Sequence, residues 1–231
     1  MSFPADRAPA PATRQLTRAE AGLVRGRLEL GARIEVPHEP RYAATAKARR
    51  NGWLARLRGN ASRFPALLEN QLLLAESECR AGRPSYCLEA ADRALTGAPG
   101  DTRALVWKGS ALAQLAAIGP PAERPARLKQ ARALIVRANR ADPDALLPLI
   151  TYSRSFTDVA EVPNDAAVDG MFKVVEPVPA APTPRVQLAR ELIRRGLAEE
   201  ARRVVLPVAN GAFDSPERPA ARGLLQGTPA K

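Results

Sequence analysis

The 231-residue sequence has few of the residues that build β-sheets, metal sites or disulfide-rich folds. Only 4 % of its residues are aromatic, and it contains one histidine and two cysteines. Ala and Leu dominate its 45 % of hydrophobic residues, a balance that favours helices. One pair of cysteines, Cys79 and Cys87, makes no disulfide framework, and its spacing does not match a zinc pair. We therefore interpret both as small buried residues.

Long apolar runs are also absent. No stretch approaches the roughly 18 uninterrupted apolar residues of a membrane span, and residues 1–16 contain no apolar core of the signal-peptide type. The expectation is a cytoplasmic protein without a membrane span, although a truncated start would hide a signal.

Residues suited to catalysis are scarce. The single histidine, His38, lies between Pro37 and Glu39 in an irregular stretch, with no second histidine or cysteine nearby to complete a metal site. The sequence has no H-E-x-x-H, no G-x-S-x-G and no Walker-type glycine loop. We predict no catalytic residue, no metal site and no cofactor, and expect that the chain is not an enzyme.

The formal net charge of +11 raises the alternative of a nucleic-acid-binding protein. Most of the positive charge is Arg, and Ala, Pro and Gly are abundant too, a bias that GC-rich coding produces without functional demand. A basic helix expected at 42–58 contains Trp53, which would stack on a base or insert into an acidic membrane surface. We favour packing of Trp53 on Leu57 and Phe64, and we do not expect nucleic acid as the main partner.

The chain is predicted to begin with a tail and a helical pair. Residues 1–15 hold three prolines and too little apolar surface to fold, so we expect a disordered tail. Within 16–63, Thr17 and Glu20 form a capping box that starts a first helix, and the basic helix at 42–58 follows it.

From residue 64 to 213 small residues recur at fixed offsets. In a first unit, 66–100, Ala75 is followed by Cys87 after twelve residues, Ala94 after seven more and Pro99 after five more. A second unit, 102–143, repeats these steps of seven and five and has ten extra residues, which we place in a loop at 119–125. Its small residues are Gly109, Ala131, Ala138 and Pro143.

Two further units are weaker or lack the final proline. The third, 144–179, has Ser153, Ala167, Val174 and Pro179, and the fourth, 182–213, has Ala189, Gly196, Ala201 and Val208. Gly82 and Gly196 fall where the chain turns between two helices. Residues 214–231 are expected to form a capping helix, 216–226, and a tail.

This recurring pattern resembles the tetratricopeptide repeat (TPR) family, and in particular the C-terminal repeat segment of larger bacterial TPR proteins. The resemblance implies an all-α, right-handed superhelix of antiparallel helix pairs, in which small residues lie where two helices cross. It also implies protein or peptide binding on the concave face, which the first helix of each pair lines. The chaperone-binding members use a Lys and Asn clamp, but this chain has Leu72 and Glu76 at those places and departs from it.

The repeat register assigns nine residues to the predicted concave face: Leu72, Glu76, Val106, Ser110, Ile150, Arg154, Val186, Arg190 and Arg194. They form an apolar strip with acidic residues at one end, where Glu69 also lies, and arginines at the other. We predict that this face binds an extended or helical segment with apolar anchors and an acidic patch. A groove whose charges contact only water is the alternative.

The sequence thus predicts a non-catalytic scaffold or adaptor for protein interaction. One alternative is the accessory C-terminal region of a larger enzyme, for example a metallopeptidase, whose catalytic domain is absent here. The other is a nucleic-acid-binding helical protein.

Overall fold

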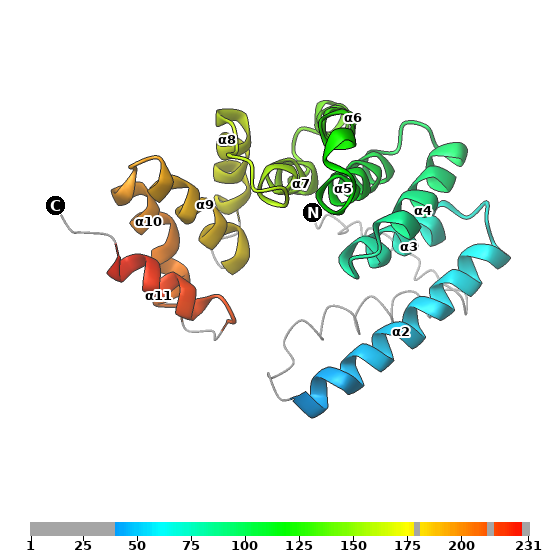
Figure 1. Cartoon of the computed structure of the whole chain (residues 1–231), viewed down its shortest axis with the longest axis horizontal. Helices are drawn as coiled ribbons and strands as arrows, with labels where there is room; N and C mark the ends of the chain where they lie inside the picture. The colour runs from blue at the N-terminus through cyan, green and yellow to red at the C-terminus, as the bar shows by residue number, and fades with distance from the viewer. Residues whose placement is uncertain (1–39, 178–180, 212–214, 228–231) are drawn as a thin grey trace, which may run out of the picture. The chain divides into compact units, whose positions relative to one another are not determined.

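The computed structural model describes residues 40–177, 181–211 and 215–227, with side chains from residue 51 onward. All regular structure in these ranges is helical, and they contain no strand (Figure 1). The predicted tail, the predicted helix at Thr17, His38 and Pro179 lie outside the described residues. The prediction of an all-α fold is confirmed.

The chain divides into two compact units, residues 1–53 and 54–231. Helix α2, Pro40–Arg63, crosses the division, and it is longer at both ends than the predicted helix at 42–58. In the second unit its side chains Leu54, Leu57 and Ala61 are buried.

Among the described residues of the second unit, four helix pairs and a final helix follow α2 (Figure 1). The bounds are α3 Leu68–Arg80, α4 Pro84–Gly97, α5 Thr102–Ile118, α6 Arg124–Ala141, α7 Leu146–Thr157, α8 Asp165–Val175, α9 Pro182–Arg194, α10 Ala198–Ala209 and α11 Arg218–Gln226, with a short 3-10 turn, η2, at Pro121–Glu123. Within each pair the two helices pack together, and the first helices α3, α5 and α7 pack in succession. Helices α7 and α9 are not in such close contact, so the row of first helices opens between the third and fourth pairs.

Turn and cap residues define the ends of the helices. Gly82 and Gly196 have φ angles of +70° and +76°, in the left-handed region that glycine enters without steric cost. The side chain of Asp101 accepts a hydrogen bond from the backbone N–H of Ala104 at 2.8 Å and caps α5. Asn164 caps α8 in the same way.

Gly109 lies where the two helices of the second pair approach each other. A Cβ atom added to Gly109 in α5 would lie 2.9 Å from the carbonyl oxygen of Ala131 in α6 and 2.6 Å from Cγ1 of Ile135. Ala75 and Ala189 are fully buried in the first helices of their pairs. The absence of a larger side chain lets the helix backbones come close together.

The ten extra residues of the second pair do not form the predicted loop at 119–125. Helix α5 has 17 residues against 13 in α3, and α6 has 18 against 14 in α4. Most of the insertion therefore lengthens the two helices, and the connection is only 119–123. The sequence 111–118 is rich in Ala and Leu, which continue a helix readily.

The interpretation of Cys79 and Cys87 as unpaired small residues was wrong. Both are buried, but their sulfur atoms form a disulfide bond that joins α3 to α4, with a Cα–Cα distance of 5.1 Å. The turn at Gly82 reverses the chain, and this reversal brings residue 87 against residue 79. Linear spacing alone carries no such information, because the contact depends on the angle between the two helices.

Candidate protein-binding groove

The gap between α7 and α9 forms a groove of about 530 Å³. Helices α8 and α11 complete its walls. The lining residues are Ser153, Thr157, Pro163, Val168, Met171, Gln187, Leu188, Arg190, Glu191, Ile193, Arg194 and Leu224.

The floor of the groove is apolar. Val168, Met171 and Leu188 are buried members of the hydrophobic core that the third and fourth pairs share, and the half-buried Leu224 of α11 packs against that core. Ile193 is 36 % exposed beside them. An apolar side chain placed here would leave water and gain roughly 25 cal/mol per Å² of buried surface.

A network of charged residues holds one side of the groove. Glu191 is almost fully buried and accepts hydrogen bonds from Arg194 and, at 2.9 Å, from Nε of Arg195. Arg195 also donates to Asp165 at 2.5 Å and to the carbonyl oxygen of Pro163 at 2.6 Å. Hydrogen bonds to Asp165 and Glu191 raise the pKa of Arg195. This network connects the end of α9 to the start of α8 and keeps the rim in place.

Arg190 is the rim cation that this network leaves out. Its side chain is exposed, and no ion pair or hydrogen bond joins it to any residue in the part of the chain that the structure describes. Arg194, one turn later, is paired with Glu191. Arg190 can therefore bind a carboxylate of another molecule without losing a contact within the chain.

Arg154 and Asp158 lie at the end of α7 and do not line the groove. Their side chains form an ion pair with an N–O distance of 3.7 Å. Burial raises the pKa of Asp158, and the nearby charge of Arg154 only partly opposes this.

The structure spreads the predicted concave residues over different environments. Leu72, Val106 and Val186 are buried in the hydrophobic clusters between helices. Ser110 and Ile150 are half-buried. A partner therefore finds fewer of these apolar side chains at the surface than the register predicts, and their role in binding stays a prediction.

The acidic residues at one end of the predicted apolar strip form ion pairs with arginines of the same chain. Glu76 forms an ion pair with Arg80 at 3.0 Å, and Glu69 forms one with Arg103 at 2.6 Å. Hydrogen bonding to Glu69 raises the pKa of Arg103.

Sequence reasoning missed four lining residues that come from outside the first helices. Pro163 lies in the connection between α7 and α8. Val168 and Met171 belong to α8, and Leu224 belongs to α11. The α8 residues follow the ordinary pattern of a buried helix face, so no sequence signal separates them from core residues. The cap helix offered one signal, since Leu224 and Leu225 form an apolar edge at its end.

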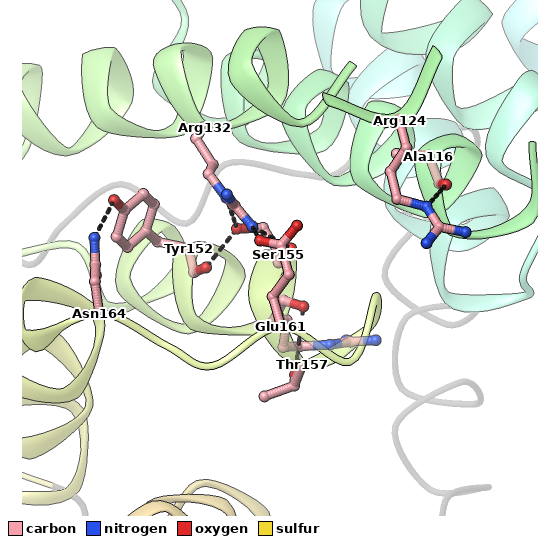
Figure 2. A network of polar contacts seen from close by, with 9 residues as sticks. Ala116, Arg124, Arg132, Tyr152, Ser155, Thr157, Glu161 and Asn164 are labelled. Carbon is pink, nitrogen blue, oxygen red and sulfur yellow. Dashed lines mark hydrogen bonds and ion pairs between the residues drawn. The ribbon is translucent and has the colours of Figure 1, made fainter. Parts of the chain in front are cut away.

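Arg132 of α6 positions the helix that forms the other wall of the groove (Figure 2). It donates to the side-chain oxygen of Ser155 at 3.1 Å, to the backbone oxygen of Ser155 at 3.0 Å and to Glu161 at 2.6 Å. Its guanidinium carbon lies 3.6 Å from the centre of the Phe156 ring. Figure 2 also shows Asn164 donating to the hydroxyl of Tyr152, at 3.2 Å. These contacts fix the end of α7, which carries the groove residues Ser153 and Thr157.

The described residues offer neither a metal site nor a membrane span. No three of their His, Cys, Asp or Glu side chains lie together in a way that would hold a metal ion. None of their helices is both long enough and apolar enough to cross a membrane.

The arrangement of helix pairs is that of a tetratricopeptide-type protein. One similar solved structure is TTC0263, described as a thermophilic TPR protein in Thermus thermophilus, with a TM-score of 0.69 and 17 % sequence identity over 89 % of this chain and 98 % of that chain. Two crystal structures of MamA have TM-scores of 0.48, with identities of 14 % and 16 %, over 83 % and 74 % of this chain and 97 % and 91 % of theirs. No protein-family model and no curated protein sequence matches the chain. The fold that the repeat pattern predicted is thus confirmed by the first of these similarities.

Proposed function

We propose that this chain is a non-catalytic scaffold that holds a segment of another protein in the groove between α7 and α9. The segment is extended or helical, places an apolar side chain on the floor and presents a carboxylate to Arg190. The observation that carries the proposal is an apolar groove of about 530 Å³ with an exposed cation on its rim.

The chemistry of the groove supports a protein partner. A floor formed by Val168, Met171 and Leu188 suits an aliphatic side chain, and a single guanidinium suits one carboxylate. Apolar anchoring combined with a peripheral charge is the usual pattern for bound peptide segments. The partner with an acidic patch that the sequence predicted is consistent with Arg190, while Arg194 and Arg154 already have acidic partners within the chain.

The disulfide bond bears on where the protein works. Disulfides persist in oxidising compartments and are rare in the reducing cytosol. The pair Cys79–Cys87 therefore favours an oxidising compartment over the cytoplasmic location that the sequence led us to expect. Labelling of free thiols in freshly lysed source cells distinguishes the two, because a cytoplasmic chain would present both cysteines as thiols.

Site-specific photo-cross-linking tests the groove. A photoreactive amino acid at Gln187, which lines the groove, is expected to capture a defined partner in the source cells. The same residue at Glu199, an exposed position on α10, is the matched control. Arg190→Glu should weaken capture at position 187 by about tenfold or more, whereas Lys173→Glu on the surface of α8 should leave it unchanged.

Equal capture at positions 187 and 199, or capture at 187 that Arg190→Glu leaves unchanged, would show that the groove is not the binding site.

A further inference from the structure

A second surface, on α6, has a different composition from the groove. Residues 64–231 contain 22 basic and 19 acidic side chains, and six of the basic but none of the acidic ones lie in α6. The six are Arg124, Arg127, Lys129, Arg132, Arg137 and Arg140. Helix α6 therefore has a net positive charge, whereas acidic side chains slightly outnumber basic ones in the rest of this region.

Among the described residues, acidic side chains neutralise only part of this charge. Arg127 pairs with Glu123, and Arg132 pairs with Glu161. Within the part of the chain that the structure describes, Arg124 and Arg137 donate only to backbone carbonyl oxygens, those of Ala116 and Pro99. Lys129 and Arg140 have no polar partner among the described residues. Four of the six cations therefore remain available for an anionic partner.

Five residues of α6 line a surface hollow of about 390 Å³: Arg132, Ala133, Val136, Arg137 and Arg140. Three arginines line the hollow together with two small apolar side chains. Two of the three are held by the chain, because Arg132 pairs with Glu161 and rests on the Phe156 ring, and Arg137 donates to the carbonyl oxygen of Pro99 at 3.3 Å. Arg137 and Arg140 are the two without an acidic partner among the described residues. Cations held in this way lose little conformational entropy when they bind a ligand.

We propose that this face of α6 is a second protein-binding surface, whose partner is an acidic segment with carboxylates flanking a small apolar side chain. Guanidinium groups bind carboxylates in a forked geometry, and the positive potential accelerates the encounter with an acidic partner. The residues from 132 to 140 span about 12 Å along α6, which is a little over two helical turns. A short peptide segment can lie along this length.

The composition of the hollow favours a peptide over other anions. Helix α6 has no Phe, Tyr or Trp on which bases of a single strand would stack. It exposes no large apolar side chain of the kind that enters a membrane surface. A phosphate backbone has nothing apolar to cover Ala133 and Val136, whereas a peptide with a Val or Ala between acidic residues does.

Fluorescence anisotropy with a defined probe tests the proposal on the full chain. The probe is a labelled peptide of about 12 residues that alternates pairs of Glu with Val, compared with a peptide of Gln in place of Glu. The double variant R137E/R140E is expected to weaken binding of the Glu peptide about tenfold or more, and the Gln peptide should not bind.

The matched control is K173E/R222E. Like Arg137, Arg222 is exposed and donates to a backbone carbonyl oxygen, that of Ala209, and like Arg140, Lys173 is exposed without a polar partner among the described side chains. This variant changes the net charge by the same amount and should bind the Glu peptide as the unaltered chain does. Circular dichroism of both double variants verifies that each is folded.

Several results would overturn the assignment. An equal loss of affinity in both double variants would mean a general charge effect. Loss in R190E but not in R137E/R140E would assign the peptide to the groove between α7 and α9. Tighter binding of a duplex or single-stranded DNA that depends on Arg137 and Arg140 would make the surface a nucleic-acid site.

Discussion

Gly109 of α5 lies so close to Ala131 of α6 that a Cβ atom on the glycine would come within 2.9 Å of the alanine's carbonyl oxygen. The obstacle is backbone, which cannot rotate away as a flexible side chain can. The close approach of the second helix pair therefore depends on the missing side chain.

Gly109→Ala should destabilise the protein, although Ala is the better helix former. Overpacking of this kind costs about 1 to 3 kcal/mol, which outweighs a gain of up to about 1 kcal/mol from helix propensity. Gly59→Ala is the matched control, because Gly59 in α2 has no atom within 4 Å of the added Cβ, and it should be neutral or stabilising. Urea unfolding of both variants measures the difference, and a stabilised Gly109→Ala protein would refute the close crossing.

The bond between Cys79 and Cys87 should stabilise the first helix pair. It closes a loop with a sequence separation of 8 residues, for which the loss of unfolded-chain entropy corresponds to about 2 to 3 kcal/mol. A reducing agent should therefore lower the unfolding temperature of the unaltered chain. The double variant Cys79→Ala/Cys87→Ala should be less stable and insensitive to the reducing agent. An unaltered chain whose unfolding temperature does not respond to reduction would contradict this prediction.

Arg132 and Phe156 should be energetically coupled, since their groups are 3.6 Å apart and partly shielded from water. A double-mutant cycle with Arg132→Lys and Phe156→Leu should give a coupling of about 1 to 2 kcal/mol. The exposed pair Arg63 and Phe64, at 5.5 Å, serves as the comparison and should give about 0.5 kcal/mol or less. Equal coupling energies in the two cycles would show that the Arg132–Phe156 contact stabilises the protein no more than an exposed pair does.

Asp158 should make stability depend on pH in an unusual direction. Because burial raises its pKa in the folded chain above the ordinary 3.8, the folded state binds a proton more tightly than the unfolded state does. Its contribution to stability is therefore full below pH 3.8 and is lost as the pH rises through the folded-state pKa.

Asp158→Asn removes this titration. The variant should gain stability relative to the unaltered chain as the pH rises above 3.8, and should lose that advantage in acid. Chemical unfolding across the acidic range, with Asp169→Asn on the surface of α8 as a control, measures the difference. A constant difference at every pH would mean that Asp158 titrates normally.

The repeat register and its turns could be predicted because they depend on local properties of the chain. Gly82 and Gly196 were expected at turns, and both adopt positive φ. The start of the cap helix was expected near Pro216, and α11 begins at Arg218. Each of these features involves residues within about one helical turn of each other.

The groove could be predicted only in part. Arg190 and Arg194 were assigned to a binding face from the register, and both line the groove. Leu72, Val106 and Val186 received the same assignment, but neighbouring helices bury them. The register says which way a residue points along its own helix, and it does not say how closely the next helix approaches.

Local sequence was enough to specify helices, turns and the glycine at the crossing of α5 and α6, because helix propensity, positive φ and the absence of a side chain are properties of single residues and their near neighbours. The distances between helices decided the rest: the bond between Cys79 and Cys87, the opening between α7 and α9, and which arginines find an acid within the chain. These outcomes arise from packing between segments far apart in the sequence, where a small change in a crossing angle moves side chains into or out of contact.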